Sequence, residues 1–487
     1  MLPAIATRFN PMRVQLVSLC PTDAARHAGR VALTPELLAA TGARYSRNNE
    51  GLDAILARID PERLDESVDS IFRMLDYGHQ SIADMAPLAI FIDGVSAWLA
   101  YLVWSLAPQA GGQESSTRYI RLAPEGLATP DTIGLATGDH EAWRQAMQAA
   151  FGHYQALERG WQALAEAAPG RLRIPAALLN DESPKAQRQV ARMRRNFAFD
   201  RARYLLPAAA LTNLMLVMSA RAWAALCQQL DASPLPEARA LAAAIRGELA
   251  LGAPRLLRHA VATEAARRGQ ADAFDACAAT ARRGLPQPLA RETGAADHPD
   301  TASLDVLPPP GVDAAAFAAA LRHHDNRYAW IGDPLRRTAV RFAWEAVAFA
   351  EIRDLNRHRT GSKYCPPVPM GFYAAVDQLP GADAADRAQA PVAALDAAVA
   401  FGCGLARRAH ERLAAGDPTY VYWTLLGTQF PFEHVTTADK FIYEAELRTG
   451  AGAHFRYARH LHDALALWFG RFPETRPFVL EGSAEPE

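Results

Sequence analysis

Cysteine is scarce in this chain, and its arrangement excludes a disulfide framework. The 487 residues include five cysteines, an odd number without a C-x-x-C pair, at Cys20, Cys227, Cys277, Cys365 and Cys403. Reduced thiols in a cytosol are the simplest account of that pattern. Residues 1–4 do not begin the basic and apolar stretches of a signal peptide. We therefore expect a cytoplasmic protein.

A strong net charge is also absent. The 51 Lys and Arg residues nearly balance the 53 Asp and Glu residues, so the formal net charge is −2. A nucleic-acid binder normally carries a clear basic excess, and we expect no nucleic-acid partner. One basic run consists of Lys185, Arg188, Arg192, Arg194 and Arg195. It favours a solvated helix face, with a phosphate or polyglutamate contact as the alternative.

A long uninterrupted apolar run is missing as well. Residues 87–106 are almost wholly apolar, but Asp93 and Gly94 interrupt them early. The uninterrupted part is too short to cross a bilayer, and an aspartate inside a membrane would be costly. We expect a buried strand over 88–92, a turn at the interruption, a buried helix over 95–106, and no membrane partner.

Several signatures of catalytic and cofactor sites do not occur. No G-x-G-x-x-G opens a strand–helix unit, which argues against a Rossmann-type dinucleotide site. No Gly-Lys-Ser/Thr phosphate loop and no Gly-x-Ser-x-Gly elbow are found. The histidines of His323-His324-Asp325 and His460-x-His462 lack the frame of a metal site. We expect these histidines at the surface and expect no metal.

What the chain does have is a large apolar fraction, half of all residues, which suffices for two or more domains. Apolar residues recur at helical spacing in both halves, over 141–168, 214–230, 236–266, 335–356, 391–415 and 434–447. Proline-flanked residues between the halves predict a linker. We expect domains at 1–285 and 313–487, a linker at 286–312, and an α+β, predominantly helical fold.

The two halves also share an order of features. Each has an apolar run that ends in a short polar motif, Trp104-Ser105-Leu106-Ala107 in the first half and Asn356-Arg357-His358-Arg359 in the second. Each then has a connector, followed by a long helix near an arginine. This order predicts two divergent repeats. The alternative is a chance similarity between alanine-rich helices.

Polar motifs divide between the halves. The first half contains Gly78-His79-Gln80-Ser81 and Glu114-Ser115-Ser116-Thr117-Arg118-Tyr119, whereas the second contains Arg357-His358-Arg359. Together they resemble the flavin-dependent thymidylate synthases, in a duplicated and fused form. That family carries Gly-His-x-Ser, an arginine-histidine-arginine tripeptide and a segment like Asn-Glu-x-Ser-x-Arg-Tyr. The resemblance implies two divergent repeats, each a small mixed sheet packed with long helices.

Two later positions divide in the same way. Arg203 resembles the family's arginine that holds the nucleotide phosphate, and Arg448 resembles the one that lies against the pyrimidine. The family's active sites lie between the subunits of a homotetramer. The complementary division therefore implies one composite site built from both repeats, in a homodimer that forms a pseudo-tetramer.

The resemblance implies reductive methylation of deoxyuridine monophosphate at the pyrimidine 5-carbon. Methylenetetrahydrofolate would supply the carbon, FAD the hydride, and NADPH the electrons that reduce the flavin again. The flavin would contact His79, Arg357, His358 and Arg359. The substrate would contact Glu114, Ser116, Arg118, Arg203 and Arg448. Arg448 and Ser116 would be catalytic, since a guanidinium near the uracil oxygens stabilises charge on the ring.

The chain departs from the family pattern near the expected substrate. Asp354 replaces a glutamine three residues before the tripeptide, and Gly450-Ala451-Gly452 stands where a histidine is usual. The accepted nucleotide could therefore differ. The rivals are C5-methylation of another uridine nucleotide, a non-catalytic flavin- or nucleotide-binding protein, and a protein that keeps the fold and binds a protein partner. We expect Cys365 to be an ordinary buried thiol, with a nucleophile beside arginine as the alternative.

Overall fold

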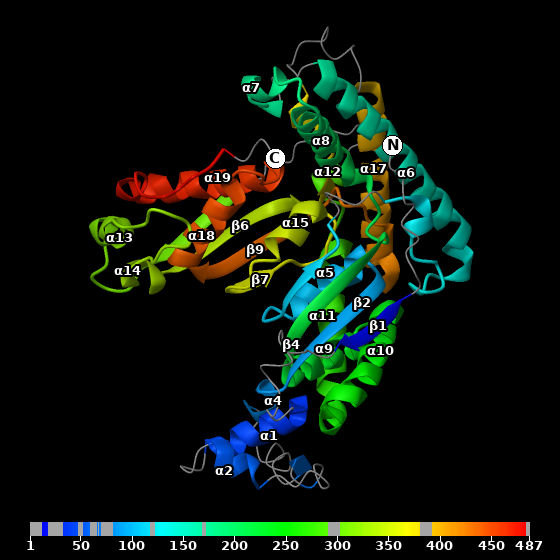
Figure 1. Cartoon of the computed structure of the whole chain (residues 1–487). Coiled ribbons are helices and arrows are strands. Elements are labelled where there is room, and N and C mark those ends of the chain that lie inside the picture. The colour runs from blue at the N-terminus through cyan, green and yellow to red at the C-terminus, as the bar shows by residue number, and fades with distance from the viewer. Residues whose placement is uncertain are drawn as a thin grey trace. The chain divides into compact units, whose positions relative to one another are not determined.

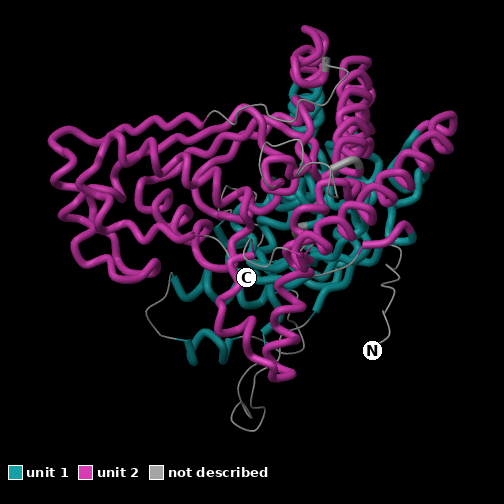
Figure 2. The backbone as a smooth tube through the Cα atoms, turned by 90° about the horizontal axis from the view of Figure 1, so that it is seen from above, with its two compact units in different colours: residues 1–115, 125–135, 210–274 teal, residues 116–124, 136–209, 275–487 magenta. Residues whose placement is uncertain are grey.

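A computed structural model describes most of the chain. The described residues are 12–17, 33–46, 52–58, 66, 68–69, 81–116, 122–167, 172–290, 302–379 and 392–483. The chain divides into two compact units, which Figure 2 colours separately. Unit 1 comprises residues 1–115, 125–135 and 210–274, and unit 2 comprises residues 116–124, 136–209 and 275–487. Unit 2 thus includes a long segment of the expected first domain, 1–285.

Unit 1 is built on a four-stranded antiparallel sheet in the order β1-β2-β4-β3. The strands are β1 Arg13–Val17, β2 Pro87–Ser96, β3 Gly111–Glu114 and β4 Leu211–Ser219. Along β4, Leu214, Leu216 and Met218 are buried whereas Val217 is exposed. That alternation follows from the two-residue period of a strand with one covered face.

Helices cover the buried face of this sheet. The helices of unit 1 are α1 Pro35–Tyr45, α2 Leu52–Leu56, α4 Ser81–Asp84, α5 Ala97–Leu106, α9 Ala220–Ala232 and α10 Pro236–Gly252. Trp223 of α9 donates from Nε1 to the carbonyl of Leu88 at 3.2 Å. Ser96 accepts from the Leu99 amide and so caps α5. Helix α11, Glu264–Arg282, continues from unit 1 into unit 2.

Unit 2 contains a second antiparallel sheet, in the order β5-β6-β9-β7, with β8 also paired to β9. The strands are β5 Ala302–Leu307, β6 Ala339–Ala348, β7 Ser362–Tyr364, β8 Gly371–Phe372 and β9 Thr428–Thr437. β5 lies within 286–312, the segment expected as a linker. Its pairing with β6 makes it part of the second sheet instead.

The helices of unit 2 include the longest in the structure. They are α6 His140–Ala167, α7 Ala176–Leu179, α8 Pro184–Ala202, α12 Gln287–Ala290, α13 Ala314–Leu321, α14 Asp333–Arg336, α15 Phe349–Leu355, α17 Val392–Ala414, α18 Ala438–Thr449 and α19 Phe455–Arg471. Helices α18 and α19 lie along the sheet that contains β6 and β9 (Figure 1). Phe342, Phe441 and Trp468 join strand and helices, with ring centroids 5.1 and 5.7 Å apart. Buried aromatic pairs of this kind stabilise a core beyond the area that they bury.

The two sheets share one plan. In each, the second strand carries a register shift near its end, between Ile92 and Val95 in β2 and between Trp344 and Val347 in β6. A helix begins directly after each of these strands, and the last strand pairs with the second and third. This common topology supports the predicted duplication. The mostly helical α+β fold with two small sheets is confirmed.

Equivalent segments of the two halves also pair with each other inside unit 2. The amide of Leu426 donates to the carbonyl of Leu206 at 2.8 Å, and the amide of Ala208 donates to the carbonyl of Thr424 at 3.0 Å. Both segments stand just before the last strand of a sheet. Antiparallel pairing of equivalent segments is the arrangement that a local two-fold axis produces.

The sequence expectations for residues 87–106 are largely confirmed. A strand and a helix follow each other there, but Asp93 and Gly94 form a bulge inside β2 instead of a turn, and Gly94 has a φ of +70°. Among the described residues, none of the helices is long and apolar enough to span a membrane.

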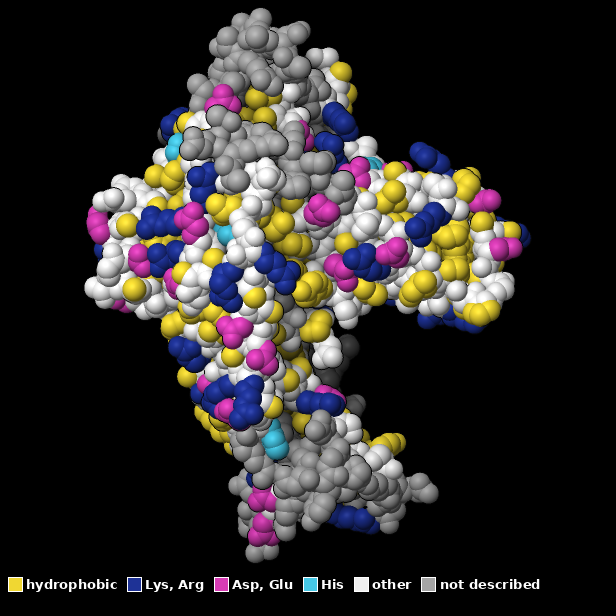
Figure 3. All heavy atoms as spheres, turned by 180° about the vertical axis from the view of Figure 1, so that it is seen from behind, with side chains coloured by type: hydrophobic (Ala, Val, Ile, Leu, Met, Phe, Trp, Pro, Cys, Tyr) yellow, Lys and Arg dark blue, Asp and Glu magenta, His cyan; other side chains and the backbone are white. Residues whose placement is uncertain are grey.

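The basic run lies on α8, where Lys185, Arg188, Arg192 and Arg195 are exposed. This bears out the predicted solvated helix face. Figure 3 shows one face of the molecule, on which Lys and Arg side chains lie among Asp and Glu side chains.

Candidate functional site

The basic tripeptide follows α15 in unit 2. Helix α15 ends at Leu355, and Asn356 is its C-cap residue. Of the next three residues, Arg357 is half-buried, His358 is buried and Arg359 is exposed. The turn therefore presents two arginines on the accessible side and turns the histidine into the protein.

His358 is hydrogen-bonded to Arg448 of α18. The Nε of Arg448 donates to the Nε2 of His358 at 2.7 Å. Arginine has donors only, so the Nε2 of His358 must be unprotonated, and its imidazole is neutral. Burial, reinforced by the charge of Arg448 and opposed by Glu444, lowers the pKa of His358 to about 3.

Glu444 is a buried carboxylate next to this pair. It lies one turn before Arg448 on α18, 3.8 Å from the Nε2 of His358 and 3.0 Å from the Nδ1 of His434. The other ring nitrogen of His434 donates to the carbonyl of Thr360 at 2.7 Å. Both ring nitrogens of His434 thus lie near oxygen atoms of the protein. Burial raises the pKa of Glu444, but its interactions with His358, His434 and Lys363 outweigh burial and lower the pKa to about 2.

The turn after the tripeptide is held by Lys363. Its Nζ donates to the carbonyl of His358 and, at 3.4 Å, to that of Thr360. Gly361, which follows Thr360, has a φ of +68°. A Cβ at this position would collide with the carbonyl oxygen of Val435. The sequence Thr-Gly-Ser-Lys after the tripeptide is therefore suited to this close turn against β9.

Arg448 is fixed by more than one contact. Its Nη2 donates to the carbonyl of Asp354 at 2.9 Å, and its guanidinium lies 5.1 Å from the ring centroid of Tyr457. The side chain remains half-buried. A guanidinium held in this way is positioned before any ligand arrives, which is what electrostatic catalysis requires.

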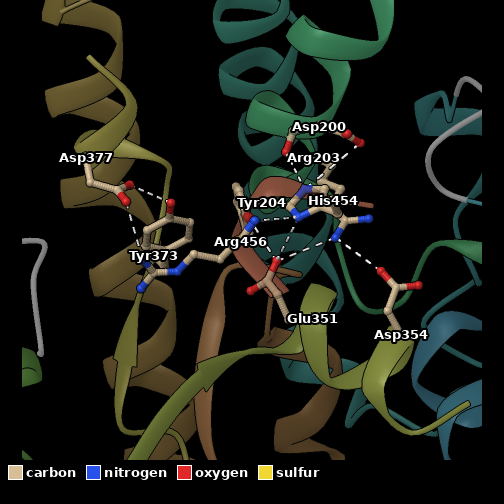
Figure 4. A network of polar contacts seen from close by, with 9 residues as sticks. All are labelled: Asp200, Arg203, Tyr204, Glu351, Asp354, Tyr373, Asp377, His454 and Arg456. Atoms are coloured by element: carbon tan, nitrogen blue, oxygen red, sulfur yellow. Dashed lines mark hydrogen bonds and ion pairs between the residues drawn. The ribbon is translucent and has the colours of Figure 1, made fainter. Parts of the chain in front are cut away.

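Arg203 lies in a buried polar network that Figure 4 shows. The arginine is in the 3-10 turn Arg203–Leu205 and is 1% exposed. Its Nη2 is 3.5 Å from Oε1 of Glu351 and 3.4 Å from Oδ2 of Asp354, both on α15. Tyr204 donates from its hydroxyl to Oε1 of Glu351 at 2.8 Å. Burial acts to lower the pKa of Arg203, but Asp354 and the other negative groups raise it overall.

Glu351 has an unusual environment within this network. Its Oε2 is buried and has no hydrogen-bond partner among the residues that the structure describes. Burial raises the pKa of this carboxyl to about 7, although Arg203 and Arg456 act in the opposite direction. The neutral form of Glu351 therefore exists close to neutral pH.

Arg456 of α19 extends the network on the far side of Tyr373. Its guanidinium lies 4.1 Å from the ring centroid of Tyr373, and its Nη1 is 3.3 Å from Oδ2 of Asp377. The hydroxyl of Tyr373 donates to Asp377 at 2.6 Å. His454, at the start of α19, donates to the carbonyl of Asp200 at 3.3 Å. α8, α15 and α19 thus meet through charges instead of apolar packing alone (Figure 4).

The first-half site residues are placed less completely. His79 and Arg118 lie outside the described residues. Glu114, at the end of β3 in unit 1, accepts a hydrogen bond from Nε1 of Trp104 at 3.1 Å. Ser116 is half-buried. Among the predicted site residues, the structure brings His358 and Arg448 together, and Asp354 contacts both Arg448 and Arg203.

Sequence reasoning missed three of the carboxylates and histidines that hold these residues. Glu351 escaped notice, although it stands three residues before Asp354 and so shares its helix face. Glu444 stands four residues before Arg448, a spacing that also indicates one face. His434 lies at an inward position of β9, which only the strand register reveals.

The structure corrects the expected surface position of two histidines and, in part, the expected burial of Cys365. His324 and His460 are buried, not at the surface. His324 contacts both carboxylate oxygens of Glu446 at 2.9 Å, and His460 lies against Trp344. Cys365 is half-buried and, like the other cysteines that the structure describes, is not part of a disulfide. No metal-binding group of three ligands occurs among the described residues.

Comparisons with known proteins point to one family. The family model Thy1, described as thymidylate synthase complementing protein, matches residues 31–255. No curated protein matches the sequence significantly. Two similar crystal structures are those of the UMP/dUMP methylase PolB from Streptomyces cacaoi, bound with 5-Br dUMP and with 5-Br UMP.

The likeness to these structures is distant. The sequence identities are 16% and 15%, and the TM-scores are 0.31 and 0.30. The matches cover 51% and 53% of this chain and 94% and 100% of the solved chains.

Proposed function

We propose that the protein methylates a uridine monophosphate at the pyrimidine 5-carbon, because the Thy1 family model of thymidylate synthase complementing proteins matches residues 31–255. Deoxyuridine monophosphate is the leading substrate. Methylenetetrahydrofolate would donate the carbon, and FAD and NADPH would provide the reducing equivalents. The observation that carries this proposal is the family match over the segment that holds the first-half motifs.

The donor set around the tripeptide suits a flavin. Arg357 is half-buried and Arg359 is exposed, and guanidiniums are good partners for a pyrophosphate and for an anionic ring. His358 is less suited to direct contact, because it is buried and its Nε2 accepts from Arg448. We propose that Arg357 and Arg359 hold FAD, with His79 of the first half, and that His358 orients Arg448. Bound FAD would supply hydride chemistry.

The substrate contacts fall to residues of both halves. Arg118 and Ser116 would bind the phosphate, with Glu114 beside them. Arg448 would face the uracil ring, where its charge would stabilise negative charge as the 5-carbon becomes nucleophilic. Its contacts with His358 and Asp354 leave the guanidinium half-buried and fixed in direction. These roles form one composite site of two repeats, in a cytoplasmic homodimer that would make a pseudo-tetramer.

A second candidate, methylation of another uridine nucleotide, is favoured by Asp354. This residue replaces the family's glutamine, and its carboxylate is engaged by Arg203 at 3.4 Å. The amide group of the family's glutamine is therefore replaced here by a carboxylate, which faces Arg203. Uridine monophosphate itself is the alternative substrate to compare.

The direct test is product formation by the full chain. Purified protein would be incubated with methylenetetrahydrofolate, FAD and NADPH, and with either deoxyuridine or uridine monophosphate. Liquid chromatography with mass spectrometry would detect the methylated nucleotide. We expect a product from at least one nucleotide, and we expect Arg118→Ala and Arg357→Ala each to abolish it.

Two outcomes would contradict the proposal. A protein that binds FAD and nucleotide but forms no methylated product is a non-catalytic binding protein. A protein that binds neither retains only the fold and would be examined for a protein partner. Full activity in either arginine variant would contradict the composite site.

A further inference from the structure

Two carboxylates tie α15 to the turn that precedes β4. Glu351 and Asp354 are three residues apart and therefore lie on one face of the helix. Arg203 contacts both, at 3.5 and 3.4 Å, and Tyr204 donates to Glu351 at 2.8 Å. Asp200, one turn earlier on α8, lies in the same network (Figure 4). The arginine thus joins two segments that are about 150 residues apart in sequence.

The burial of Arg203 conflicts with a direct grip on a substrate phosphate. The residue is 1% exposed, and its positive charge is balanced by carboxylates inside the protein. A phosphate that took this guanidinium would leave the buried Glu351 and the half-buried Asp354 without their partner. Buried charges that lose a partner are strongly unfavourable. Without any ligand, the Nη2 of Arg203 already lies within ion-pair distance of both carboxylates.

Asp354 is held from two directions. Its carboxylate receives Arg203, and its backbone carbonyl receives Nη2 of Arg448 at 2.9 Å. Asp354 stands in the last turn of α15, three residues before Arg357. Any shift of this turn would move the tripeptide, and the same shift would break the contact with Arg448.

We propose that Arg203 is a positioning residue, which clamps α15 and so sets the place of Arg357, His358 and Arg448, and that it does not touch the substrate. The inference rests on the proposed function for its kinetic consequences. It departs from the role in phosphate binding that the family resemblance implies for Arg203. The Asp354 that replaces the family's glutamine supplies the carboxylate that this clamp requires.

Kinetics of Arg203→Lys distinguish the two roles. Lysine keeps the charge but cannot span both carboxylates in a fixed geometry. A clamp predicts that kcat falls about tenfold or more and that bound FAD is lost, with the KM for the nucleotide changed by less than about twofold. A phosphate grip predicts a KM raised about tenfold or more, with kcat and bound FAD unchanged. The second result would overturn the proposal.

Arg201→Lys is the matched control. Arg201 is also buried and lies two residues away, but it donates to the carbonyl of Phe197 and to Gln378 and stacks on aromatic rings. We expect Arg201→Lys to lower the melting temperature without the loss of FAD. If both lysine variants lose FAD in proportion to their melting temperatures, a general loss of stability explains the effect and the proposal fails.

A stability cycle tests the clamp even if the chain forms no methylated product. Arg203→Met, Asp354→Asn and the double variant would be compared by thermal unfolding of the full chain. The effects of substitutions at residues in contact are not additive. The double variant should therefore lose clearly less melting temperature than the two single variants lose together. Additive losses would overturn the clamp. If Arg203→Met does not fold, recovery of folding in the double variant supports the clamp, and continued failure contradicts it.

Discussion

Arg448 donates from its Nε to the Nε2 of His358 at 2.7 Å. This single contact assigns the protonation state of the histidine, because a guanidinium cannot accept a hydrogen bond. The histidine of the basic tripeptide is therefore a neutral, buried acceptor. The arginine, in turn, gains a fixed direction while it stays half-buried.

Replacing Arg448 by methionine should raise the pKa of His358. The positive charge of Arg448 is one of the causes that lower this pKa, together with burial. The chain has 14 histidines, so the signal would be assigned by its absence in His358→Gln in carbon-13 NMR titrations. Arg448→Lys keeps the charge and should leave the pKa of His358 low. An unchanged titration in Arg448→Met would contradict this account.

Glu444→Gln should destabilise the protein at neutral pH. Removing one member of a buried charged group costs about 3–5 kcal/mol, and Glu444 is buried beside His434 and His358. The folded-state pKa of Glu444 lies below its ordinary value of 4.5, at about 2. Its stabilisation is therefore present above pH 4.5 and is lost as the pH falls toward 2.

Urea unfolding at pH 7, 5 and 4 would measure this effect. The difference between the unmodified protein and Glu444→Gln should shrink in acid. Glu433→Gln is the matched control one residue before His434. Its pair with Arg341 is partly exposed, so it should cost no more than about 1 kcal/mol. Equal losses of unfolding free energy in Glu444→Gln and Glu433→Gln would show that burial does not govern how much each carboxylate stabilises the protein.

Glu351→Gln should change the pH dependence of stability in the sense opposite to Glu444→Gln. The folded-state pKa of Glu351 is raised from 4.5 to about 7, so the folded protein keeps a proton that the unfolded chain releases. The stability that Glu351 contributes therefore falls as the pH rises from 4.5 to 7 and is constant above that. The total change is at most about 3 kcal/mol.

Thermal or urea unfolding of both proteins between pH 4.5 and pH 8 would test this prediction. The difference in unfolding free energy, unmodified protein minus Glu351→Gln, should decrease up to pH 7. Two parallel curves would indicate that the carboxyl is ionised throughout, in which case Arg203 and Arg456 outweigh the burial of Glu351.

Gly361→Ala should disrupt the turn after the tripeptide. Gly361 has a φ of +68°, and a Cβ there would collide with the carbonyl of Val435 and lie 2.8 Å from Cβ of Thr436. Gly416 is the matched control, with a φ of +84° and nothing within 4 Å of an added Cβ. Gly416→Ala should cost only the backbone strain, about 1–2 kcal/mol.

Gly361→Ala should cost clearly more than its control, and it should also reduce FAD binding because the turn directly follows Arg357 and Arg359. Unfolding by urea would give the first comparison, and fluorescence of added FAD would give the second. Equal stability losses at the two glycines would mean that the turn moves away from β9 without difficulty.

Several residues of the polar network around the tripeptide were singled out from the sequence, but their contacts could not be predicted. His358 and Arg448 were both singled out, yet they were given different ligands, the flavin and the pyrimidine. Residues 90 positions apart cannot be paired by spacing, because their contact depends on how α15 and α18 pack on one sheet. Arg203 was likewise predicted to hold a phosphate, since nothing in the sequence shows that Glu351 and Asp354 face it.

The helical character follows from the periodicity of the sequence, which is a local property. The two small sheets were expected only from the family resemblance, which short motifs carry, and several stretches with helical periodicity form strands instead. The tertiary structure decided which charges meet. Burial and long-range strand pairing assign Arg203 to the carboxylates of α15 and make His358 a neutral acceptor. These are properties of neighbours in space, and each depends on the removal of water from groups that the sequence alone leaves solvated.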